Sequence, residues 1–188
     1  MRTILPLALA LAVGCSTSSE WPGASRPYKN KVHAIPGTIE TEDFDEGGEG
    51  VAYHDAEPAQ KETHQPPYRD TGVDLEWRED ASQKFNLGWT RPGEWMIYTV
   101  DVKEAGTYTI EMMVACDKLG GQFRLEFNGV DKTGPVTVPD SGGWTKLIPF
   151  SKEGVKLEPG RYAMKLVLDK GGVKGSIGDI DYFRFVKK

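Results

Sequence analysis

The feature of the sequence that most restricts its fold is a series of short, strand-like runs from residue 37 onward, with no helical period. Runs such as 94–102, 106–116 and 160–169 alternate apolar or β-branched residues with polar ones. Gly, Pro, Asp and Asn separate the runs, and these residues favour turns. About ten runs without helices are typical of an all-β, antiparallel β-sandwich of the jelly-roll type.

The N-terminus has the pattern of a secretory signal. "MRTILPLALALAVGC" has one charge, Arg2, and then an uncharged apolar run that ends in small residues before Cys15. The run is too short to be a membrane-spanning helix that precedes a cytosolic domain. Its "AVGC" ending resembles a bacterial lipobox, which implies a signal peptide over 1–14 and a lipid anchor on Cys15 that makes the membrane a partner. An ordinary signal peptide that leaves a soluble protein is the alternative.

The segment after Cys15 is rich in Ser, Pro and Gly, which is typical of a tether, and we assign it to 15–36. Residues 37–188 are long enough for one domain with its own core. The residue after Cys15 is Ser16 and not an acidic residue, and in this respect the sequence resembles lipoproteins that are sent to the outer membrane. The expected location is therefore the cell envelope, at the outer membrane or facing the periplasm.

The charge balance and the cysteines exclude several classes of protein. The net charge of −5 and the scattered lysines leave no basic footprint for nucleic acid. Cys116 is the only cysteine after Cys15, so the mature domain has no internal disulfide. Cys116 lies on a strand-like run and is interpreted as a buried structural thiol. We expect a monomer.

Acidic residues recur near both ends of the predicted domain. "IETEDF" places Glu40 and Glu42 on one side of a strand, and "GDIDYF" places Asp179 and Asp181 in the same relation. The terminal strands of sandwiches commonly lie side by side, which would bring these acids together. Converging carboxylates repel one another unless a proton or a cation relieves them, and Ca²⁺ is the expected cation in a secreted protein. The alternatives are two pairs of solvated acids, or glycosidase chemistry with an acid and a base.

Two aromatic residues follow glycine-rich turns. Tyr53 comes after "GGEGVA", and Trp144 lies in "PDSGGWTK". Glycines permit backbone conformations that leave a neighbouring ring projecting, and an exposed flat ring can stack on the apolar face of a sugar. The alternative for Trp144 is a ring folded back over the end of the sandwich. Trp77 and Trp89 end predicted strands, so they belong either to the edge of the core or to a second binding face.

Several blocks together resemble the family 6 carbohydrate-binding modules. "TIETEDFDEGGEGVAYHD", "YRDTGVDLEW", "LGWTRPGEWMIYTVDV", "AGTYTIEMMVA", "PDSGGWTKL" and "IDYFRF" occur in the family's order, over residues 37–187. Family 35 modules are similar in fold and motif style. The resemblance implies a jelly roll that binds glycans without cleaving them.

The resemblance also implies roles for individual residues. Tyr53 and Trp144 match the pair that sandwiches a sugar in the family. Asp179 matches a polar residue, often Asn, that hydrogen-bonds the same sugar. Asp at this position is a departure, because an ionised carboxylate accepts hydrogen bonds but cannot donate them. His54 has no match of this kind, and its place beside Tyr53 indicates a loop residue or a sugar contact, not a metal ligand.

The same resemblance assigns a structural Ca²⁺ to Glu40, Glu42 and Asp181. A second site on the concave sheet face, found in some members, has Trp95 and Glu94 as candidates.

The sequence therefore predicts a lipid-anchored, noncatalytic glycan-binding module. A small carboxylate-dependent glycoside hydrolase or polysaccharide lyase is one alternative. A structural envelope protein that has lost its ligand is another. The irregular segment 56–67 is expected to influence which sugar is bound.

Overall fold

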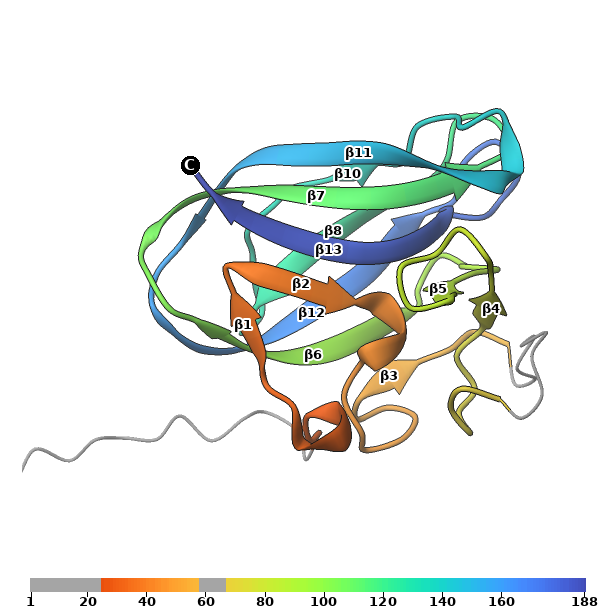
Figure 1. Ribbon diagram of the computed structural model, residues 1–188. Helices are drawn as coiled ribbons and strands as arrows, with labels where there is room; N and C mark the ends of the chain where they lie inside the picture. The colour runs from red at the N-terminus through yellow and green to blue at the C-terminus, as the bar shows by residue number, and fades with distance from the viewer. Residues whose placement is uncertain (1–24, 58–66) are drawn as a thin grey trace, which may run out of the picture.

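The computed structural model describes residues 25–57 and 67–188, which form two β-sheets packed face to face (Figure 1). One sheet has the order β1-β6-β12-β8-β10, with β3 beside β6 and β9 beside β8. Its strands are β1 (His33–Ile35), β3 (Tyr53–His54), β6 (Trp95–Val102), β8 (Gln122–Phe127), β9 (Val130–Asp131), β10 (Val136–Thr137) and β12 (Gly160–Lys170). The expected all-β sandwich is confirmed.

The second sheet has the order β11-β7-β13-β5-β4, with β2 beside β13. Its strands are β2 (Gly37–Glu40), β4 (Leu75–Trp77), β5 (Phe85–Leu87), β7 (Gly106–Cys116), β11 (Gly143–Leu157) and β13 (Asp179–Lys187). The short 3₁₀ turns η1 (Tyr28–Asn30) and η2 (Thr41–Asp43) complete the description. In this part of the chain, only β1 and β6 pair in parallel.

The core lies between the sheets and follows from the alternation in the strands. In β8, Phe123, Leu125 and Phe127 are buried, whereas the residues between them are only partly buried. Phe183 and Phe185 of β13 face them from the other sheet. Removal of this apolar surface from water is the main stabilising contribution to such a fold.

The first and last strands of the second sheet lie side by side, as the sequence predicts. Glu40 of β2 is opposite Tyr182 of β13. The prediction that Glu40 and Glu42 share one face of a strand is wrong, because β2 ends at Glu40 and the chain turns into η2. This turn places Glu42 in the interior.

The N-terminal boundary also differs from the expected one. Residues 33–35 pair with β6 as β1, so the folded part includes the end of the segment that the sequence assigned to a tether. The proposed signal peptide, Cys15 and most of the loop 56–67 lie outside the described residues. Within the described residues, no helix has the length and apolar character needed to span a membrane.

The start of β11 is irregular. Gly143 pairs with Cys116 of β7, but the register then shifts, and regular pairing resumes only at Ile148. Trp144 lies in this interrupted stretch. The irregularity places an aromatic side chain at the end of the sandwich, where β5 ends and β13 begins.

Candidate functional site

A cavity of about 470 Å³ opens at this end of the sandwich. Its wall includes two tryptophans, Trp89 and Trp144, together with Asp179 and other polar residues: Glu76, Arg91, Asp117, Lys174 and Ser176. Small-molecule sites typically combine this volume with apolar rings and a few placed polar groups. This cavity is the candidate functional site.

Trp89 is held in an uncommon backbone conformation directly after β5. Its φ of 45° lies in the left-handed region, which bulky residues rarely adopt. The neighbours on both sides are anchored: Gly88 N donates to Asp74 O at 3.1 Å, and Thr90 Oγ1 donates to Gly178 O at 2.9 Å. Such strained residues concentrate at functional sites, where the surrounding structure maintains them.

Trp144 follows two glycines in left-handed conformations, Gly142 with φ 84° and Gly143 with φ 144°. The turn is fixed by Ser141, whose Oγ accepts from Cys116 N at 2.9 Å and donates to Gly143 O at 2.7 Å. The indole is half-buried and packs on the main core with one side. The sequence left open whether this ring projects from its loop or folds back over the end of the sandwich. In the structure, the indole packs against the core and also lines the cavity.

Asp179 is the buried carboxyl group of the cavity wall. It begins β13, and its Oδ2 lies 3.4 Å from Nη1 of Arg78. Burial raises the pKa of Asp179 well above its usual value, and the negative charge of Glu76 adds to this effect, whereas Arg78 opposes it. The carboxyl oxygens of Asp179 can accept a hydrogen bond from a ligand hydroxyl, as Oδ2 does from Arg78.

Charged side chains lie around the cavity opening. Lys174 Nζ is 3.4 Å from Asp117 Oδ2, and Arg91 Nε is 3.8 Å from Glu57 Oε1. All four side chains are partly exposed, so these pairs contribute little to stability. Lys174 and Arg91 line the cavity and can donate to the hydroxyl groups of a ligand.

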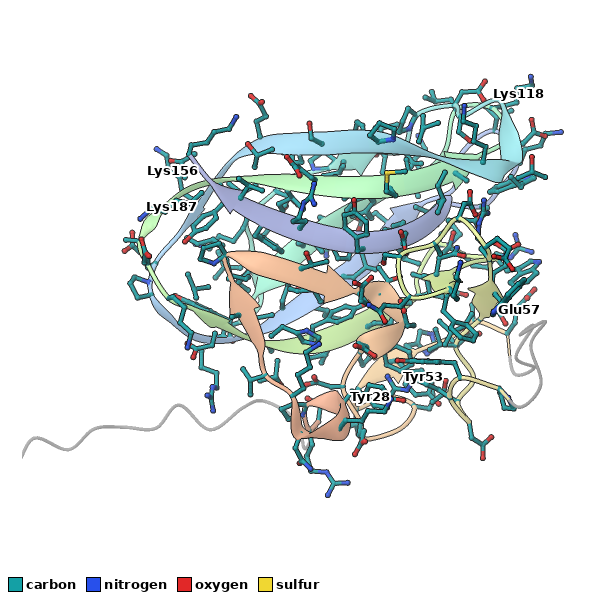
Figure 2. The ribbon with its side chains drawn as sticks, in the orientation of Figure 1. Tyr28, Tyr53, Glu57, Lys118, Lys156 and Lys187 are labelled. Atoms are coloured by element: carbon teal, nitrogen blue, oxygen red, sulfur yellow. The ribbon has the colours of Figure 1, made fainter. Side chains whose placement is uncertain are left out.

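Tyr53 does not share this cavity. It pairs with β6 through β3, is only 8% exposed, and packs edge-to-face on Phe44 with ring centroids 5.5 Å apart. Its hydroxyl accepts a hydrogen bond from Gly72 N at 3.2 Å. Figure 2 shows Tyr53 and Tyr28 near the lower edge of the molecule, and two smaller hollows on the surface border Tyr53. The expectation that Tyr53 and Trp144 face each other across one sugar is therefore not met, because the ring of Tyr53 belongs to the core.

His54 also lies away from the cavity wall. Its Nδ1 is 2.5 Å from Glu49 Oε1, in a pair that is about half exposed. Trp89, and not Tyr53, lines the same cavity as Trp144. A sequence clue to Trp89 exists, since both tryptophans follow a glycine and precede a threonine and a basic residue.

The acids of η2, β2 and β13 converge elsewhere in the fold. Ser82 joins two of them: its Oγ donates to Glu40 Oε2 and, at 3.1 Å, to Asp181 Oδ1. Glu42 is fully buried, and neither of its carboxylate oxygens meets a donor from another residue. Burial raises the pKa of Glu42 to about 9, and the charges of Glu40, Asp43 and Asp181 add to the shift.

An orphaned, buried carboxylate beside two further acids fits a hard cation with oxygen ligands such as Ca²⁺. In residues 25–57 and 67–188, however, no three His, Cys, Asp or Glu side chains stand in a ready metal-binding arrangement. A cation here would therefore need backbone oxygens as well.

The sequence matches the family model "Carbohydrate binding module (family 6)" over residues 67–187. The chain belongs to this family. Modules of family 6 are noncatalytic binding domains, although many occur as parts of enzymes. The carbohydrate-binding module described here carries both tryptophans of the cavity, Trp89 and Trp144, within the matched range.

One curated protein related to the module is the clotting factor G alpha subunit of Tachypleus tridentatus, 32% identical over 100 residues. The match covers 52% of this chain and 15% of that protein, so the chain spans only a small part of its relative.

Solved structures show the same fold. A β-1,3-glucan-binding family 6 module from Bacillus halodurans is 23% identical, with a TM-score of 0.61 over 82% of this chain and 98% of that one. A family 6 module from Cellvibrio mixtus lichenase 5A, in complex with cellotriose, is 21% identical, with a TM-score of 0.58 over 81% and 98%. At these identities the likeness concerns the fold.

Proposed function

We propose that this module binds β-linked glucan chains or their oligosaccharides in the Trp89–Trp144 cavity and does not cleave them. The observation that carries the proposal is the pairing of two half-buried indoles with one buried carboxyl group in a single cavity. Structural neighbours described as binding β-1,3-glucan and cellotriose support the ligand class.

The side chains that line the cavity can each contact a different part of a pyranose ring. The indole faces of Trp89 and Trp144 can cover the C–H faces of one sugar unit. Asp179 can hydrogen-bond a hydroxyl inside the cavity, while Arg91 and Lys174 reach hydroxyls at the opening. A short open site buries little surface, so the affinity for a single chain is modest.

Two further features belong to the proposal. Glu40, Glu42 and Asp181 hold a structural calcium ion, supported by the orphaned carboxylate of Glu42. Lipidation of Cys15 anchors the module in the cell envelope, supported by the apolar N-terminal run that ends in "AVGC". The module would then present glycans to separate enzymes.

The experiment is calorimetric titration of the protein with laminaritriose and cellotriose, preceded by a glycan panel. Trp89→Ala and Trp144→Ala should each weaken binding about tenfold or more, because losing ~1.4 kcal/mol of ring contact produces that factor. Trp77→Ala is the control, since Trp77 is exposed and does not line the cavity. Equal binding by all three variants would refute the site. Release of reducing sugar from the panel would favour the hydrolase alternative.

A further inference from the structure

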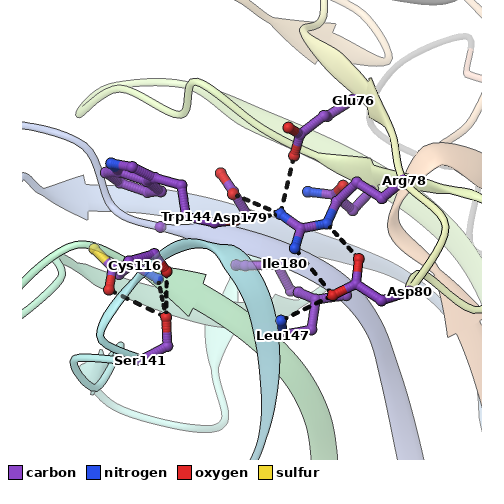
Figure 3. A network of polar contacts seen from close by, with 12 residues as sticks. Glu76, Arg78, Asp80, Cys116, Ser141, Trp144, Leu147, Asp179 and Ile180 are labelled. Atoms are coloured by element: carbon purple, nitrogen blue, oxygen red, sulfur yellow. Dashed lines mark hydrogen bonds and ion pairs between the residues drawn. The ribbon is translucent and has the colours of Figure 1, made fainter.

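The interrupted start of β11 leaves backbone groups that the sheet does not pair. Between Gly143 and Ile148 the register with β7 shifts, and buried backbone groups need other partners. Two side chains supply them (Figure 3). Arg78 Nη1 donates to Trp144 O at 2.6 Å, and Asp80 Oδ2 accepts from Leu147 N at 3.1 Å.

Arg78 and Asp80 are themselves joined as a two-pronged pair. Arg78 Nε donates to Asp80 Oδ1 at 2.8 Å, and Nη2 donates to Oδ2 at 3.1 Å. This contact holds the pKa of Asp80 down to about 2. Bidentate pairs of this kind fix direction as well as distance. The pair therefore bridges the irregular stretch of β11 from both ends.

The guanidinium of Arg78 also reaches the polar wall of the cavity. Nη1 lies 3.2 Å from Glu76 Oε2 and 3.4 Å from Asp179 Oδ2. The side chain of Arg78 is only 6% exposed. One buried cation thus contacts the backbone of Trp144 and two carboxyl groups of the cavity, while it does not line the cavity itself.

We infer that Arg78 is a positioning residue for glycan binding, which with Asp80 holds Trp144 and Asp179 in the arrangement that a sugar meets. The inference deepens the proposed function and rests on it. Arg78 touches no ligand and acts through the residues that it holds. A lysine cannot replace it, because one ammonium group does not reproduce the planar set of donors that Asp80, Trp144 O and Asp179 share.

The test combines glycan affinity with a readout of Trp144 that needs no ligand. The full chain is labelled with 5-fluorotryptophan, and ¹⁹F NMR signals are assigned by single Trp→Phe variants. Arg78→Lys should shift or broaden the Trp144 signal and weaken laminaritriose binding about tenfold. The Trp95 signal should stay in place. Arg124→Lys is the matched control, since Arg124 pairs with Glu126 and Asp169 on the other sheet.

A second variant keeps the test decisive if Arg78→Lys fails to fold. Asp80→Asn retains an oxygen for Leu147 N but loses the charged pair with Arg78, and Asp80 is partly exposed. It should move the Trp144 signal in the same direction. An unchanged Trp144 signal in the folded variants, or an equal change in Arg124→Lys, overturns the inference. If the wild type binds no glycan while the Trp144 signal moves, the positioning role stands and the proposed function fails.

Discussion

At the scale of single residues, Trp89 and Trp144 owe their positions to backbone conformations that their neighbours enforce. The left-handed φ of Trp89 is maintained by hydrogen bonds of Gly88 and Thr90, and Trp144 follows two left-handed glycines. Neither ring could be placed so precisely by packing alone, since both are only half-buried. Local backbone geometry therefore determines the aromatic wall of the cavity.

Substitutions of Tyr53 test whether its ring stabilises the core or binds the glycan. Tyr53→Phe removes the hydrogen bond with Gly72 N and should lower the free energy of unfolding by about 1 kcal/mol. Tyr53→Ala leaves a cavity beside Phe44 and should cost about 3–5 kcal/mol. Urea denaturation measures both. Glycan affinity of the folded variants should match that of the wild type, and a tenfold loss in Tyr53→Phe would return Tyr53 to the binding site.

Glu94 should make stability depend on pH. It is buried just before β6 and accepts from Arg91 N at 2.8 Å and Ala56 N at 3.4 Å. Burial raises its pKa from 4.5 to about 7, and the charges of Asp55 and Asp74 add to the effect. The folded state thus binds more protons than the unfolded state between these values, so stability falls as pH rises from 4.5 to about 7 and levels off above.

Denaturation of the wild type and Glu94→Gln across this pH range measures the effect. The difference between the two proteins should change by at most about 3.5 kcal/mol over the window, because each pKa unit corresponds to ~1.4 kcal/mol. Parallel curves for the two proteins would show that Glu94 does not titrate in this range.

At the scale of elements, the cavity depends on two loops that dock through glycines. A Cβ on Gly172 would lie 2.3 Å from the backbone carbon of Gly120 and 2.5 Å from Leu119 O. The loop between β12 and β13 carries Lys174 and Ser176 of the cavity wall. Close approach of backbone to backbone is possible here because Gly172 has no Cβ to stand between the two loops.

Gly172→Ala should therefore separate the two loops. We expect a lower melting temperature and weaker laminaritriose binding, measured by calorimetry. Gly72→Ala is the matched control, because its nearest neighbours would lie at an ordinary 3.7 Å and its φ is not left-handed. A Gly172→Ala protein as stable and as tightly binding as Gly72→Ala would contradict the docking.

The limits of the long strands could be predicted from the sequence, whereas the irregular turns and register shifts could not. The alternation in 106–116 predicts β7 with its observed limits, and the predicted meeting of the first and last strands is confirmed. The turn η2 and the register shift in β11 were missed, because both depend on tertiary partners: Ile180 O accepts from Thr41 of η2, and Arg78 donates to Trp144 O. For the same reason the sequence favoured Tyr53 over Trp89: a glycine-rich turn precedes Tyr53, but only the pairing of β3 with β6 decides where its ring lies.

At the scale of the whole molecule, the acids Glu40, Glu42 and Asp181 come from β2, the turn η2 and β13. These segments are distant in sequence, so a bound cation would connect the ends of the domain. A ligand that binds only the folded state stabilises it by mass action, about 2.7 kcal/mol at 100 times its Kd.

Chelation should therefore lower the melting temperature if calcium is bound. The expected drop in EDTA is several degrees, with recovery on adding excess Ca²⁺, measured by differential scanning calorimetry. Glu42→Gln should remove the difference between the two conditions. Trp77→Ala, which leaves the acids intact, should keep it. Identical curves for the wild type with EDTA and with Ca²⁺ would dismiss the calcium proposal.

A ¹H–¹⁵N NMR titration of the five tryptophan indole groups with laminaritriose tests the Trp89–Trp144 cavity as the glycan site. The indole signals of Trp89 and Trp144 should move together and saturate at the same ligand concentration, while those of Trp77 and Trp95 stay fixed. Movement of Trp95 without Trp89 and Trp144, or no movement of either cavity tryptophan on binding, would contradict this site.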